Sequence, residues 1–114
     1  MDLEKYKQKI RKFADERNWE KYHNPKNLSM ALSGEAGELI EIFQWINSDD
    51  SHNLSDEDLQ AAKEELADIM IYLIRIADKL DICLESAVKE KLKLNSKKYP
   101  IELAKNNSIK YNKR

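Results

Sequence analysis

The sequence has one cysteine, two prolines and two glycines in 114 residues, and it contains no long apolar run. Cys83 alone cannot form a disulfide within the chain, which fits a reducing compartment. No segment approaches the ~20 uninterrupted apolar residues that span a bilayer, and the charged start Asp2–Lys5 is unlike a signal peptide. We therefore expect a cytoplasmic protein with no membrane partner.

An excess of charge of either sign is also missing. The chain has 20 lysines and arginines against 21 acids, and its formal net charge is -1. This balance argues against nucleic acid binding driven by overall charge. The exception is a short basic tail, from about Ile101 to Arg114, which follows Pro100.

Apolar residues recur at steps of three and four along most of the chain, and no stretch has the alternation of a β-strand. The pattern predicts an all-α protein, a four-helix bundle formed by a single domain over residues 1–114. Its third helix is apolar on more than one side through Ile71, Tyr72 and Ile74, so we expect a homo-oligomer. The first expected helix runs from about Asp2 to about Arg17, and the second starts between Pro25 and Asn27 and ends at Ile46 or Asn47. The third is capped by Ser55 and ends near Leu80, and the fourth covers about Leu84–Lys98.

Two pairs of acids stand out because a helix places each pair on one face. Glu35 and Glu38 are three residues apart, and so are Glu65 and Asp68. Most acidic pairs on helices are solvated, and we expect that for Glu41, Glu57 and Glu64. The four acids of the two pairs instead lie beside apolar positions, with no basic residue placed to neutralise them.

Magnitudes favour a bound cation between the two acidic helices. Two like charges at about 4 Å repel by roughly 4 kcal/mol at an effective dielectric constant near 20. Four clustered carboxylates would threaten a fold whose whole stability is about 5–15 kcal/mol, unless a cation binds or a proton is retained. Oxygen ligands without histidine or cysteine favour Mg²⁺, with Mn²⁺ as an alternative, and magnesium often binds phosphates as well.

Glycines and further polar or aromatic residues surround this pattern. Gly34 and Gly37 each cost a helix about 1 kcal/mol, which a close approach to the backbone would explain. Side chains suited to a nucleotide lie on the predicted fourth helix and around the second. For the lysines plain solvation is the simpler explanation, and for the aromatic residues core packing is the alternative. These side chains are Lys91, Asn95, Lys98, Trp19, His23, Trp45 and Tyr72.

The order of these blocks resembles the all-α nucleoside triphosphate pyrophosphohydrolases, the MazG-like superfamily, and within it the dCTP pyrophosphatase branch. The similarity runs from Phe13 to Tyr111 and includes Glu35-x-x-Glu38, Glu65-x-x-Asp68 and Lys98-Tyr99-Pro100. One departure is Ser96, where some relatives place a basic residue.

The resemblance implies hydrolysis of a nucleoside triphosphate between its α and β phosphates, in dimers or tetramers with sites between subunits. By matched position, the four acids would ligate magnesium, and one of them would position or deprotonate the attacking water. Lys91, Asn95 and Lys98 would contact phosphates, whereas the base and sugar pocket would be shaped by Trp19, His23, Trp45 and Tyr72.

The sequence thus predicts a magnesium-dependent pyrophosphohydrolase that removes surplus or non-standard nucleotides, with a preference for pyrimidine deoxynucleotides such as dCTP. One alternative is a related helical pyrophosphohydrolase acting on a dUTP-type or phosphoribosyl-ATP-type substrate. The other is a non-catalytic helical oligomer that binds a nucleotide.

Overall fold

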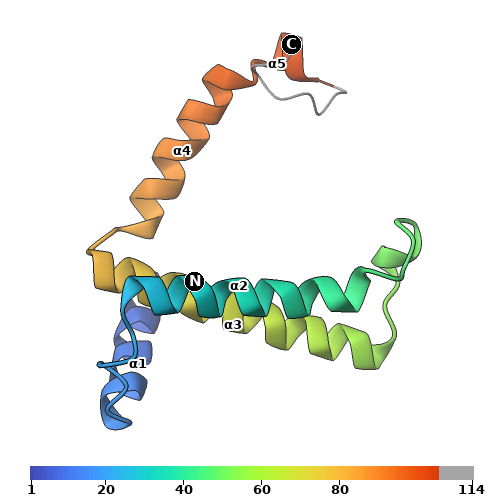
Figure 1. The fold of residues 1–114 in the computed structure, drawn as a ribbon. Coiled ribbons are helices and arrows are strands. Elements are labelled where there is room, and N and C mark those ends of the chain that lie inside the picture. Colours follow the sequence, from blue (N-terminus) through green and yellow to red (C-terminus); the bar gives the residue numbers. More distant parts are fainter. Residues whose placement is uncertain (106–114) are drawn as a thin grey trace. The chain divides into compact units, whose positions relative to one another are not determined.

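A computed structural model of the chain describes residues 1–105, and every regular element in that range is helical (Figure 1). The predicted all-α class is therefore confirmed for this part of the chain. None of these helices combines the length and the apolar character needed to cross a bilayer. The elements are α1 (Leu3–Glu16), α2 (Pro25–Phe43), the 3-10 turn η1 (Asp50–His52), α3 (Asp56–Leu80), α4 (Leu84–Lys98) and α5 (Ile101–Ala104).

Three helices begin at side-chain caps, of which the sequence analysis predicted the one at Ser55. The carboxylate of Asp2 accepts the backbone N–H of Lys5 at 3.1 Å, so Asp2 caps α1 and the helix itself starts at Leu3. Asn24 caps α2, with Pro25 as the first helical residue, and Ser55 caps α3. Each cap satisfies a backbone donor that the first turn leaves without a partner.

The end of α2 differs from the prediction. The helix stops at Phe43, whereas the apolar pattern predicted an end at Ile46 or Asn47. The backbone N–H of Ile46 bonds back to the carbonyl of Phe43, which tightens the last turn. The side chain of Asn47 accepts the N–H of Asp50 at 2.9 Å, and such local bonds compete with helix continuation.

The first of two compact units, Met1–Ile82, contains α1, α2 and α3. Helices α2 and α3 run antiparallel and side by side, and α1 packs against α3 (Figure 1). At Asp81 the backbone turns left-handed, with a φ of 58°, and α3 ends there. The buried apolar residues are Ala14, Leu28, Ala62, Ile74 and Ala77.

The second unit, Cys83–Arg114, contains α4, whose bounds agree with the prediction, and the single turn α5 after Pro100. The four-helix bundle stays a prediction, because only three helices belong to the first unit. The basic tail predicted from about Ile101 begins with this turn. The rest of the predicted tail, residues 106–114, lies outside the described residues.

Within the described residues, one side of α3 carries a row of exposed leucines. Leu59, Leu66, Leu73 and Leu80 recur every seven residues, and each is between 39% and 56% exposed. The sequence analysis predicted a second apolar side of this helix from Ile71, Tyr72 and Ile74. Of these, Ile71 is 42% exposed, whereas Ile74 is buried in the core of the first unit.

Candidate functional site

Three of the four predicted metal ligands meet between α2 and α3. Glu35 and Glu38 are one turn apart on α2, and Glu65 faces them from α3. One carboxylate oxygen from each lies within 4.8 Å of the other two. Within residues 1–105 no lysine or arginine forms an ion pair with any of the three.

Two oxygens of this carboxylate cluster are buried and have no conventional partner: Oε2 of Glu35 and Oε2 of Glu65. Two ionised carboxylates cannot donate to each other, so they need either a shared proton or a cation. A proton shared with Glu35 raises the pKa of Glu65 to about 8, and burial and Glu38 act in the same direction. This all-oxygen donor set suits a hard divalent cation.

The fourth predicted ligand, Asp68, is not among the three clustered carboxylates. It follows Glu65 by one turn of α3 and lines a neighbouring cavity of about 250 Å³, here called the aromatic cavity. The cavity brings together α1, the α1–α2 connection and α3. Its lining residues are Ile10, Phe13, Ala14, Trp19, His23, Asp68, Ile71, Tyr72 and Arg75.

Three of the four residues predicted to shape a base and sugar pocket share this aromatic cavity: Trp19, His23 and Tyr72. The rings of Trp19 and His23 are 5.8 Å apart between centroids. Burial raises the pKa of Tyr72, and the charges of Glu35 and Asp68 add to the effect. The charge of Glu35 thus acts on Tyr72, and Asp68 lies one turn of α3 after Glu65, so the cavity adjoins the carboxylate cluster.

The other predicted contacts lie elsewhere. Trp45 follows the C-terminal end of α2 and is 89% exposed, whereas Trp19 and His23 precede its N-terminal end. A helix of 19 residues is about 28 Å long, so one chain cannot place Trp45 and Trp19 on the same base. Their joint role stays a prediction that requires a second copy.

The predicted phosphate contacts Lys91, Asn95 and Lys98 all lie on α4, in the second unit. Their role also stays a prediction. Gly34 and Gly37 have no atom within 4 Å of an added Cβ, so nothing in the described chain accounts for them. The three acids expected to be solvated, Glu41, Glu57 and Glu64, are exposed.

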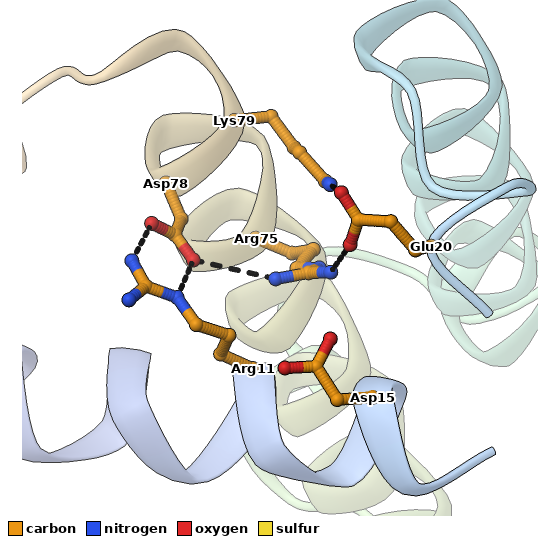
Figure 2. Close-up of a pocket in the computed structure, with 6 residues that line it drawn as sticks. All are labelled: Arg11, Asp15, Glu20, Arg75, Asp78 and Lys79. Carbon is orange, nitrogen blue, oxygen red and sulfur yellow. Dashed lines mark hydrogen bonds and ion pairs between the residues drawn. The ribbon is translucent and has the colours of Figure 1, made fainter. Parts of the chain in front are cut away.

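Sequence reasoning missed Arg75, which was considered only as a distant counter-charge for Asp68. This side chain is almost fully buried, with 2% of the residue exposed. Figure 2 shows its guanidinium between two carboxylates: it donates to Asp78 at 3.3 Å and to Glu20 at 2.9 Å. Its position seven residues after Asp68 on the same helix face was the available signal.

The ion pairs of Arg75 extend in both directions (Figure 2). Asp78 also accepts two hydrogen bonds from Arg11 of α1, at 2.5 and 3.0 Å, and these lower the pKa of Asp78. Glu20 is also paired with Lys79, and this contact lowers the pKa of Glu20. The network thereby ties α1 and the α1–α2 connection to α3, beside the aromatic cavity.

Arg75 also contacts His23, a wall of that cavity. Its Nε–H donates to Nδ1 of His23 at 3.2 Å. Burial lowers the pKa of His23, and the positive charges of Arg75 and Lys79 lower it further, against the opposing charge of Glu20. The imidazole is therefore neutral at physiological pH.

Comparisons with known proteins identify relatives of this chain. The chain is 43% identical over 101 residues to dCTP pyrophosphatase 1 of Homo sapiens and 40% identical over 101 residues to that of Mus musculus. Each match covers 87% of this chain and 59% of the relative, so the chain spans little more than half of their length. A solved structure of a pyrophosphatase from Archaeoglobus fulgidus DSM 4304 superposes with a TM-score of 0.82 at 40% identity.

That superposition covers 88% of this chain and 94% of the archaeal one. The MazG-like family model matches residues 30–113, which takes in the carboxylate cluster and reaches across both compact units. The chain belongs to the MazG-like family.

Proposed function

We propose that the protein is a magnesium-dependent nucleoside triphosphate pyrophosphohydrolase that converts a (deoxy)nucleoside triphosphate to the monophosphate and pyrophosphate. The observation that carries the proposal is the cluster of Glu35, Glu38 and Glu65, with two buried oxygens that have no partner. It adjoins a cavity with aromatic walls that suits a nucleobase. The names of the relatives, dCTP pyrophosphatase and pyrophosphatase, support the same reaction.

Different groups of residues would bind the metal, activate the attacking water and bind the phosphates. The three clustered glutamates, joined by Asp68 from the next turn of α3, would hold the metal. When bound, magnesium offsets phosphate charge and lowers the pKa of a coordinated water. One carboxylate would accept the proton of the attacking water, and Lys91, Asn95 and Lys98 would contact the phosphates.

The aromatic cavity would receive the base and the sugar. Trp19 and His23 lie on the α1–α2 connection, and Tyr72 lies on α3 one turn after Asp68. We propose dCTP as the preferred substrate, because the human and mouse relatives carry that activity in their names. Removal of surplus pyrimidine nucleotides would be the resulting role in the cell.

We further propose that the active protein is a homo-oligomer in which two copies complete the helical bundle and the site. The exposed leucines of α3, which repeat every seven residues, are typical of a helix that packs against another helix. The length of α2 gives a second reason: Trp19 precedes this helix and Trp45 follows it, so a neighbouring copy would supply Trp45 to the cavity.

The reaction is tested with a panel of purified triphosphates, each assayed for pyrophosphate release with magnesium present. We expect dCTP to be hydrolysed with the highest kcat/KM and to yield dCMP and pyrophosphate. Activity highest on dUTP or on phosphoribosyl-ATP would identify a related pyrophosphohydrolase. Nucleotide binding without any pyrophosphate release would contradict the proposal and indicate a binding protein.

Metal binding should appear in the pH dependence of stability. Between about pH 4.5 and about 8 the folded, metal-free protein retains a proton on Glu65 that the unfolded chain has released. Its free energy of unfolding therefore falls as the pH rises through this window and levels off above it. Magnesium ligates the ionised carboxylates, so the gain in Tm from added magnesium should be larger at about pH 8.5 than at about pH 6.

Thermal unfolding followed by circular dichroism measures this difference, with EDTA as the metal-free condition. Potassium chloride at matched ionic strength is the control, because general screening of charge would raise Tm without need of a dication. If added magnesium left Tm unchanged at both pH values, the result would count against the metal site, as would full activity in EDTA.

A further inference from the structure

Arg75 links the ion-pair network to the aromatic cavity through one hydrogen bond. Its Nε–H donates to Nδ1 of His23 at 3.2 Å, while its two terminal nitrogens are held by Asp78 and Glu20. An arginine keeps its protons at any physiological pH, so Arg75 can only donate in this contact. Nδ1 of His23 must therefore be an acceptor and carry no proton.

A neutral imidazole has one protonated nitrogen, so this contact leaves the proton on Nε2. The planar guanidinium is itself fixed by two carboxylates, and Arg75 is only 2% exposed, so the contact cannot move freely. Among the described residues no other side chain is hydrogen-bonded to the His23 ring. His23 lines the cavity, so Nε2–H is the donor that its ring can offer to a ligand there.

We infer that Arg75 is a positioning residue that fixes His23 as the Nε2–H tautomer, so that the cavity offers a hydrogen-bond donor to an acceptor atom of the nucleotide. This inference rests on the proposed function for the identity of the ligand. A cytosine base carries two such acceptors, its O2 carbonyl and N3. An acceptor group on the ligand is therefore selected, and a donor at the same place is rejected.

The tautomer is tested directly, without substrate, by ¹⁵N–¹H correlation NMR of the two histidine rings. His52 is the internal control, because it is exposed in η1 and no residue of the described chain fixes its ring. In alkaline buffer we expect His23 to be one tautomer with the proton on Nε2 and His52 to be a mixture. A proton on Nδ1 of His23, or a mixture like that of His52, would overturn the inference.

Kinetics then separate positioning from general support of the fold. Arg75→Met should raise the KM for dCTP by up to roughly fivefold, the limit set by complete loss of the hydrogen bond from His23, and leave kcat unchanged. The matched control is Arg11→Met, which removes the other arginine bound to Asp78 but does not touch His23. We expect this control to leave KM unchanged.

A double-mutant cycle completes the test. In a His23→Phe background, Arg75→Met should raise KM no further, because the group that Arg75 positions is already gone. An equal rise in both backgrounds would assign Arg75 a structural role only. If Arg75→Met fails to fold, Arg75→Lys keeps a positive charge for Glu20 and Asp78, and we expect it to release the His23 tautomer in the NMR spectrum.

The NMR result also separates this inference from the proposed function. A fixed Nε2–H on His23 in a protein that hydrolyses no triphosphate would overturn the proposed reaction and leave the positioning intact. An active dCTP pyrophosphohydrolase with a freely exchanging His23 tautomer would overturn the inference alone.

Discussion

Glu65→Gln is expected to lower pyrophosphate release by at least about 100-fold. Mutation of a residue that only hydrogen-bonds to a metal ligand already lowers metal affinity or activity about 10–100-fold, and Glu65 is proposed as a ligand itself. The same change should raise the Tm of the metal-free protein above about pH 8, where the ionised Glu65 is repelled by Glu35 and Glu38. Glutamine has nearly the same shape, carries no charge and can donate an N–H to a buried oxygen of Glu35.

The matched control is Glu64→Gln, which neutralises the adjacent, exposed acid of α3 and should leave both activity and Tm almost unchanged. Activity is measured as pyrophosphate release, and stability by thermal unfolding in EDTA. An active Glu65→Gln protein would contradict the metal site. A variant with lower Tm in EDTA would contradict the repulsion between the three carboxylates.

Leu66→Glu combined with Leu73→Glu should convert the proposed oligomer to monomers and abolish activity. Both leucines lie on the exposed stripe of α3, and each contributes roughly 1 kcal/mol when its exposed half becomes buried in a partner. Two changes in each of two chains should therefore weaken a dimer by roughly 1,000-fold or more, before charge repulsion is added.

Sedimentation velocity gives the mass, and circular dichroism checks that the helices survive. The control pair is Leu66→Met with Leu73→Met, which keeps the volume and apolar character and should keep the oligomer. An unchanged mass for the glutamate pair would exclude this stripe as the interface. A wild-type monomer that is already active would refute the shared site altogether.

Much of the fold follows from local sequence signals, such as the residues that cap helices. The starts of α1, α2 and α3 are fixed by Asp2, Asn24 and Ser55, each of which supplies an oxygen to a first-turn N–H. The end of α2 was less predictable. Ile46 continues the apolar period, but the side-chain bond from Asn47 starts the next turn, and periodicity does not register such a bond.

The candidate site, like the fold, could be predicted only in part from the sequence. Spacing alone places Glu35 beside Glu38, and the pairing of the two acidic helices then brings in Glu65. Spacing could not tell that Asp68, one turn later, would line the aromatic cavity, since that depends on how α1 packs on α3. Arg75 was missed because its partners Glu20 and His23 are more than 50 residues away in sequence.

The buried carboxylate oxygens between α2 and α3 would make metal binding depend on pH. If Glu65 holds a proton at neutral pH, each dication that binds there must displace it into solvent. Apparent metal affinity would then rise with pH below about 8, by up to tenfold per unit. In a mildly acidified cell more of the protein would lack metal, so the proposed hydrolysis of nucleotides would slow through proton competition, without any separate regulator.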